Sequence, residues 1–384
     1  MSKQVTTLKN TTPEFNRSVA RDLVDSLRDS SKQPEAKKTS ESSISVDHLV
    51  SKSYSPTINE LLTNLKSLSL QPAAFNCELD QQIRIKSGSS IKCVDWESKE
   101  AQRVMLHNLN SKKIDFSKII APANIEKNCW FNVFFMCFFI SDKGRKFFRN
   151  FRHGMITGKA PGPRDITVVN RHMRWPMFLL NYYINSSIMG VDDPESFAEK
   201  MNTNILIREI GNILDMNFPG QAPMPGQPGN PLNYYSLLTS YMTNATSISV
   251  VKFYGKTLAD AKLQKYLKKQ LNNVGKLPHI LCAFVNKGKN SKEPMKTTLN
   301  VSINGKSYKY TLDSAVINDV SNKHYSALVT GNKREYASDG TAYSRLTPFS
   351  WKSKINSSEE FNFEGSEKRY NFSTSEMVLI YYRS

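Results

Sequence analysis

The sequence predicts an α+β protein, with a helical first half and a mostly antiparallel β second half. Up to about residue 241, apolar residues recur at helical spacing, for example over residues 194–216. From Ser247 onward the pattern becomes alternating or continuously apolar, as in ISVVKFYG and HILCAFV. The dipeptide Asn304-Gly305, flanked by β-branched and aromatic residues, predicts a hairpin. Helices followed by strands are typical of α+β folds.

Each element follows from a local pattern. Residues 1–54 are rich in Ser, Thr and Lys, so we expect a largely disordered tail with one amphipathic helix from Pro13 to Ser30. An N-terminal extension over residues 55–119 begins with a helix from Thr57 to Leu68, and the main domain covers residues 120–384. Its predicted helices are 129–139, 171–187, 194–216, 232–241 and 258–271. Its predicted β elements are the strands 248–255, 279–285, 324–329, 334–338 and 377–382 and the hairpin 299–317.

Composition indicates a globular protein in a reducing compartment. The chain has 384 residues, of which 39% are hydrophobic, enough for a core without disulfides. Its five cysteines form no CxxC pair, and we expect free thiols. The longest apolar run, Phe131 to Ile140, is too short to span a bilayer. We therefore expect a soluble, intracellular monomer, cytoplasmic or nuclear, that does not bind membranes.

The charge is strongly basic. With 52 Lys and Arg against 34 Asp and Glu, the formal charge is +18, which attracts polyanions non-specifically. The basic residues are scattered, and we interpret their one local cluster as a solvated face. Weak, non-specific nucleic-acid binding is the alternative. The cluster consists of Lys143, Arg145, Lys146, Arg149 and Arg152.

Cys129 is the candidate nucleophile. It stands at the predicted start of a helix, where the macrodipole and free backbone N–H groups favour a thiolate. The alternative is a small buried hydrophobe, as most free cysteines are. We expect that second role for the other four cysteines, Cys77, Cys93, Cys137 and Cys282.

Three other residues complete a hypothesis of nucleophilic catalysis. His324 opens a predicted strand, and Asp339 follows one turn and one short strand later, so the carboxylate could reach a ring nitrogen. A Cys followed by a distant His and then an Asp is typical of cysteine peptidases. Asn124 could stabilise an oxyanion with its side-chain amide, together with the backbone N–H of Cys129. The alternatives are a structural histidine and a turn or cap asparagine.

Five blocks of the sequence resemble one enzyme family. NIEKNCWFN, from Asn124 to Asn132, is similar to the cysteine box NLGNTCFMN of the ubiquitin-specific proteases. LPHILCAFVNKGK resembles their LPxVLxxHLKRF strand, and YKYTLDSAVIN followed by KHYSALV resembles their histidine box. REYASDG matches WxxFDD, and MVLIYYRS resembles the closing AYxLFYxR strand. The blocks occur in the order of the family over about residues 120–384.

The resemblance implies a papain-like fold with a helical thumb and an antiparallel β palm. It implies a Cys129–His324–Asp339 triad with Asn124 at the oxyanion, and ubiquitin or ubiquitin-like conjugates as substrates. No cofactor is implied. The CxxC pairs that hold the zinc of the family are absent, so we expect no metal and reduced or missing fingers. The candidates to pair with arginines of a ubiquitin tail are Asp313, Asp319 and Glu209.

Three departures keep alternatives open. Lys323 replaces the Gly before the histidine, Ser338 replaces a Phe, and Gly340 replaces a second Asp. One alternative is therefore an inactive protein of this fold that binds ubiquitin or serves as a virion structural module. Another is a basic nucleic-acid-binding protein that retains the fold, and a third is a cysteine peptidase with a different substrate. The compact form suggests a viral or parasite source.

Overall fold

The computed structural model describes most of the chain beyond residue 90 and a few short stretches before it. The described residues are 5–8, 68–70, 77, 81–87, 90–110, 114–159, 169–190, 197–198, 200–226, 234–235, 237–238, 241, 250–255, 260–275, 277–285, 294–321, 324–341 and 345–383. The predicted helices at 13–30 and 57–68 lie outside them, apart from Leu68 itself.

The chain divides into two compact units, each assembled from separate stretches. The first contains Met1–Gln33, Cys129–Gly144 and Ile248–Ser384, and the second contains Pro34–Asn128 and Arg145–Ser247. The chain passes from the first unit to the second within α6 (Asp142–Phe147). The predicted division into 1–54, 55–119 and 120–384 stays a prediction.

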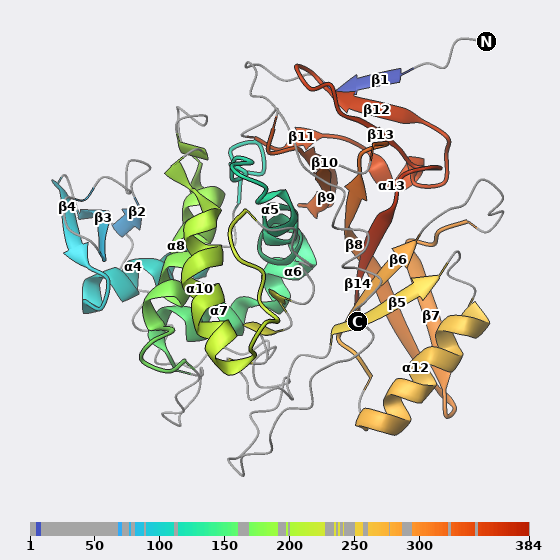
Figure 1. Ribbon diagram of the computed structural model, residues 1–384, viewed down its shortest axis with the longest axis horizontal. Helices are drawn as coiled ribbons and strands as arrows, with labels where there is room; N and C mark the ends of the chain where they lie inside the picture. The colour runs from blue at the N-terminus through green and yellow to red at the C-terminus, as the bar shows by residue number, and fades with distance from the viewer. Residues whose placement is uncertain are drawn as a thin grey trace. The chain divides into compact units, whose positions relative to one another are not determined.

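The first unit is built around a large sheet in the order β11-β10-β9-β8-β14-β6-β5, with β7 also paired to β8 (Figure 1). Its pairs are antiparallel, except that β5 runs parallel to β6. The protein is therefore α+β. The strands are β5 (Val250–Gly255), β6 (Ile280–Val285), β7 (Thr298–Ile303), β8 (Lys306–Asn318), β9 (Tyr325–Gly331), β10 (Arg334–Ser338), β11 (Thr347–Pro348) and β14 (Met377–Arg383).

Two tight turns set the register of this sheet. Between β7 and β8, Asn304 and Gly305 have φ of 51° and 75°, the left-handed values that a two-residue hairpin turn requires, and the predicted hairpin is confirmed. Between β9 and β10, Asn332 and Lys333 have φ of 48° and 65°. This second hairpin brings the start of β9 and the end of β10 to the same end of the sheet.

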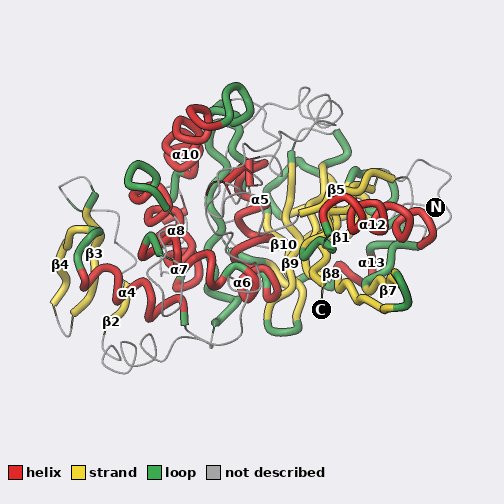
Figure 2. The backbone as a smooth tube through the Cα atoms, turned by 90° about the horizontal axis from the view of Figure 1, so that it is seen from below, coloured by secondary structure: helices red, strands yellow, loops and turns green. Residues whose placement is uncertain are grey.

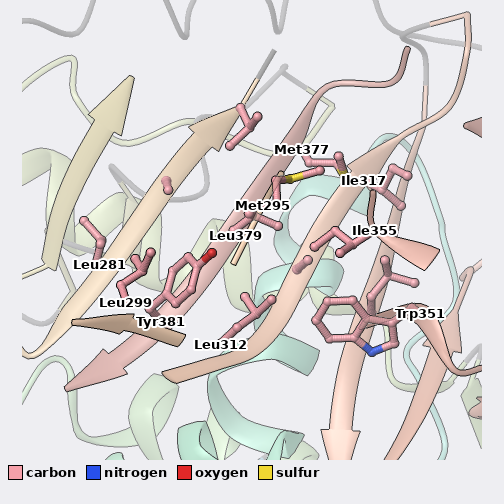
Figure 3. Packing of buried hydrophobic residues seen from close by; sticks show 14 of the residues in the cluster. Leu281, Met295, Leu299, Leu312, Ile317, Trp351, Ile355, Met377, Leu379 and Tyr381 are labelled. Atoms are coloured by element: carbon pink, nitrogen blue, oxygen red, sulfur yellow. The ribbon is translucent and has the colours of Figure 1, made fainter. Parts of the chain in front are cut away.

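Helices pack against the sheet because each has an apolar side. From α12 (Asp260–Val274), Leu263 and Leu267 enter the core cluster shown in part in Figure 3. Trp351 on α13 (Trp351–Lys354) joins the same cluster. The helix α5 (Cys129–Phe135), continued as the π-helical η1 (Met136–Ile140), contacts β9 and lies beside it in Figure 2.

A smaller three-stranded sheet, in the order β1-β12-β13, completes the first unit. β12 (Glu360–Phe363) pairs antiparallel with β13 (Arg369–Asn371). On its other side, β12 pairs in parallel with β1 (Val5–Leu8). Val5–Leu8, within the tail that we expect to be largely disordered, thus pair through backbone groups with a distant strand.

Among the residues that the structure describes, the second unit contains the helices α4, α7, α8 and α10 and a small antiparallel sheet. α8 packs against α4, α7 and α10. The sheet order is β2-β3-β4, and β2 and β3 both contact α4. The elements are β2 (Leu68–Leu70), β3 (Gln82–Ser87), β4 (Ser90–Asp95), α4 (Lys99–Leu109), α7 (Arg149–Thr157), α8 (Arg174–Met189) and α10 (Thr203–Asn217).

The structure corrects the prediction for two of the cysteines. Cys77 and Cys93 form a disulfide, with their Cα atoms 5.8 Å apart, and neither residue is fully buried. The expectation of five free thiols is therefore wrong for this pair. Cys137 and Cys282 are buried and free, as predicted.

The basic cluster is not one solvated face. Arg152 is buried, and its guanidinium donates to Asn181 Oδ1 over 2.8 Å and to Asn185 Oδ1 over 2.7 Å. Arg149 donates to Asn110 Oδ1. Of the five predicted residues only Lys146 is exposed. Within the described ranges, no helix combines the length and apolar character needed to cross a bilayer.

Candidate active site

Cys129 is the first residue of α5. Its thiol is free and half-buried, whereas Cys137 and Cys282 are sealed in the interior. The residues that follow Cys129 in the helix are buried and, apart from Asn132, apolar, and they anchor α5 in the first unit. Among the described residues, Cys129 is thus the one free cysteine that is not buried.

The loop before Cys129 has a strained backbone. Glu126 and Lys127 have φ of 47° and 67°, in the left-handed region that non-glycine residues seldom adopt. The buried side chain of Asn128 stabilises this turn. Its Oδ1 accepts from the N–H of Ile125 over 2.8 Å, and its Nδ2 donates to Ala123 O and to Thr203 Oγ1. Sequence reasoning missed Asn128, although an Asn beside a nucleophile in a turn is a usable signal.

His324 lies directly before β9 and is only 3% exposed. Asp319 holds its backbone in two ways. The N–H of His324 donates to Asp319 Oδ1 over 2.8 Å, and the N–H of Asp319 donates to His324 O over 2.8 Å. Residues 322–323 lie outside the described residues, so Lys323 does too.

Asp339 lies directly after β10 and is fully buried. Its Oδ1 is 2.6 Å from His324 Nε2. The antiparallel hairpin produces this proximity, because the start of β9 and the end of β10 lie at the same end of the sheet. Ser338, the preceding residue, is buried and accepts a hydrogen bond from Ser326 at its carbonyl.

The charges of His324 and Asp339 support each other. Burial alone would lower the pKa of His324, but the negative charge of Asp339, their hydrogen bond, and a hydrogen bond with Cys129 raise this pKa to about 10. Burial alone would raise the pKa of Asp339, but His324 and Thr341 lower it to about 2. An imidazolium–carboxylate pair is therefore the favoured state of these two residues near neutral pH.

Three of the four predicted site residues thus lie together in the first unit: Cys129, His324 and Asp339. Asn124 belongs to the second unit, five residues before Cys129, and is half-buried. Its role at an oxyanion stays a prediction. In the described part of the chain, no group of His, Cys, Asp and Glu is arranged to hold a metal ion.

The acids proposed to bind a basic tail have other partners. Asp313 is buried and accepts from the backbone N–H groups of Lys143 and Gly144. Asp319 is buried beside His324, and its Oδ2 accepts from Ser321. Both carboxylates are committed within the fold. Glu209 is half-buried and pairs with Arg208 over 3.2 Å.

Comparisons with known proteins find similarity to solved structures. No model of a protein family matches the sequence, and neither does any curated protein. The chain is similar to a structure of the SAGA DUB module Ubp8/Sgf11/Sus1/Sgf73 bound to monoubiquitin, with 10% identity, 72% of each chain covered and a TM-score of 0.42. It is also similar to the module bound to ubiquitin aldehyde, with 10% identity, 70% of each chain covered and a TM-score of 0.41.

A structure of the yeast SAGA DUB module is similar at 10% identity, with 71% of each chain covered and a TM-score of 0.38. Likeness at this level does not decide the chemistry of the present chain. That has to be argued from its own side chains.

Proposed function

We propose that the protein is a cysteine peptidase of the ubiquitin-specific protease type, with a papain-like arrangement of its catalytic groups. In this proposal it hydrolyses the isopeptide or C-terminal bond of ubiquitin or a ubiquitin-like modifier. The observation that carries the proposal is the buried His324 ring, whose Nε2 is 2.6 Å from Asp339 and which also hydrogen-bonds with Cys129. The sequence blocks around these residues point to ubiquitin-like substrates.

The proposed reaction begins with the Cys129 thiolate and the His324 imidazolium. The sulfur attacks the carbonyl carbon, and Asn124 stabilises the resulting oxyanion. The C–N bond breaks as the imidazolium gives its proton to the leaving amine, which leaves a thioester. Water then attacks the thioester carbon and gives a proton to His324. When the C–S bond breaks, the modifier is released as an acid, and the thiolate–imidazolium pair is restored.

The test uses ubiquitin and ubiquitin-like proteins that carry an electrophile at the C-terminus. We expect at least one of them to label the wild type at Cys129 and to leave Cys129→Ala unlabelled. Cys282→Ala is the matched control, since Cys282 is free and buried in β6, and it should label like the wild type. Labelling is read by mass spectrometry.

Three results would count against the proposal or change it. If the wild type reacts with none of the probes, the deubiquitinase assignment is wrong. If it also binds ubiquitin tightly without reacting, the protein is better described as an inactive binding module of this fold. Cleavage of an unrelated peptide without reaction with the probes would leave the peptidase chemistry and change the substrate class.

A further inference from the structure

A tyrosine completes the hydrogen bonding of the Asp339 carboxylate. Oδ1 of Asp339 accepts from His324 Nε2 and from the backbone N–H and hydroxyl of Thr341, over 2.6, 2.9 and 2.7 Å. Oδ2 accepts from the hydroxyl of Tyr370 over 2.8 Å. Among the described residues, Tyr370 is the one donor to Oδ2. Without it, half of a buried carboxylate would lose its partner.

The position of Tyr370 is fixed by its surroundings. It lies on β13, fully buried, and its ring stacks on Phe361 with centroids 5.1 Å apart. Phe363 meets the same ring edge-on at 5.8 Å. Both phenylalanines belong to β12, the middle strand of the β1-β12-β13 sheet. The hydroxyl is thus presented to Asp339 from a packed sheet rather than from a loop.

The hydroxyl also keeps its proton. Burial, and then the neighbouring Asp339 carboxylate, raise the pKa of Tyr370 well above 10. The phenol is therefore a neutral donor at every pH at which the protein would work. A neutral donor stabilises the carboxylate without neutralising it, so the full charge of Asp339 remains available to His324.

We propose that Tyr370 is a positioning residue: it holds the Asp339 carboxylate from the side opposite His324, and so fixes the direction in which the ring faces Cys129. A carboxylate that accepts hydrogen bonds at one oxygen only can rotate about its side-chain bonds. A carboxylate that accepts hydrogen bonds at both oxygens stays in one plane, and it can then orient the imidazole that donates to it. This inference rests on the proposed hydrolase function, and its experiment separates the two.

The experiment compares Tyr370→Phe with Tyr310→Phe. Both tyrosines are fully buried in the same core cluster, and each donates one hydrogen bond of 2.8 Å. The acceptor for Tyr310 is the carbonyl of Pro278, whereas for Tyr370 it is Asp339. The two variants therefore lose the same hydroxyl and differ in whether the lost bond reaches the carboxylate.

Three readouts are compared in the folded proteins. On a substrate that carries the ubiquitin tail, Tyr370→Phe should lower kcat about tenfold with KM unchanged, the loss expected for one charge-assisted hydrogen bond. The pH dependence of Cys129 alkylation by iodoacetamide should show its acid limb at higher pH, since Asp339 then protonates more easily. In NMR spectra, the proton shared by His324 and Asp339 should exchange faster with water. Tyr310→Phe should leave all three unchanged while lowering the melting temperature to a similar extent.

The outcomes are distinguishable. If the two variants behave alike in alkylation and in NMR, Tyr370 has only a structural role and the inference is overturned. If no ubiquitin-type substrate is cleaved but the alkylation limb and the NMR proton still change in Tyr370→Phe alone, the substrate assignment fails. The positioning role of Tyr370 then stands.

Discussion

Two buried histidines in this protein have opposite electrostatic surroundings. His153, on α7 in the second unit, is 7% exposed, and its Nδ1 lies 3.2 Å from the carbonyl oxygen of Lys159. Burial lowers its pKa, and the hydrogen bond to Lys159 offsets only part of that effect. His324 is buried at least as deeply, yet its pKa is raised to about 10 because Asp339 is its partner.

Burial alone therefore does not decide the charge of a histidine. A backbone carbonyl offers only a dipole, which does not repay the loss of hydration of an imidazolium, so His153 stays neutral near neutral pH. A buried carboxylate offers a full charge at 2.6 Å, so His324 stays protonated. An acid that donates its proton to a leaving amine requires the second environment.

Replacing the imidazole of His324, and separately that of His153, should distinguish the two histidines most strongly in kcat/KM. His324→Gln should lower kcat/KM for a ubiquitin-tail substrate by about 10³-fold or more, since general acid–base catalysis alone contributes about 10²–10⁴-fold and thiolate formation is also lost. His153→Gln, the matched buried control, should keep kcat/KM within about threefold and lower only the stability. Equal kinetic losses in the two variants would mean that the site at His324 is structural.

The second substitution makes the surroundings of His324 more like those of His153. Asp339→Asn removes the charge beside His324 and keeps a polar side chain of the same size. The pKa of His324, raised to about 10 in the wild type, should fall toward or below its ordinary value, because burial then dominates as it does at His153.

The direction of this shift in the His324 pKa predicts how kcat depends on pH. The wild-type imidazolium is present below its raised pKa and is lost as the pH rises through about 10, so the alkaline limb of kcat should lie near that pH. In Asp339→Asn, the alkaline limb should move down by more than one pH unit, and kcat at pH 8 should fall about 10²-fold or more. An unchanged limb would show that Asp339 does not set the charge of His324.

Local patterns in the sequence predicted much of this arrangement. The Asn304-Gly305 turn, the strands around His324 and the short return to Asp339 follow from residue type and alternation over a few positions. The partners that complete the site were not predicted, because they lie far away in sequence. Tyr370 is 31 residues from Asp339, and Thr203 is 75 residues from Asn128.

Contacts between distant residues also explain what the local patterns did not reveal. A tail of low hydrophobicity gives no sign that Val5–Leu8 will meet β12, since the pairing is made by backbone groups. The basic run around Arg152 predicts a solvated side chain, because the sequence does not show that Asn181 and Asn185 of α8 accept its hydrogen bonds. Cys77 and Cys93 are 16 residues apart, and their spacing alone does not distinguish a disulfide from two thiols.

Substitution of Asp319 should have the mildest effect on kcat, and it separates the charge of the His324 ring from the placement of the His324 backbone. Asp319 accepts the N–H of His324 over 2.8 Å but does not bind the ring in the way that Asp339 does. Asp319→Ala should leave that buried N–H without its acceptor, cost about 1–3 kcal/mol of stability and lower kcat only severalfold. The alkaline limb should stay near its wild-type position, because Asp339 is still in place.

Asp319→Asn, which keeps an acceptor oxygen for the N–H, should recover most of the stability lost in Asp319→Ala. Chemical denaturation and the pH profile of kcat measure the two quantities independently. A large shift of the limb in Asp319→Ala would mean that the backbone anchor and the charge pair act as one unit. The contrast between His324 and His153 would then depend on the whole 319–324 loop and not on Asp339 alone.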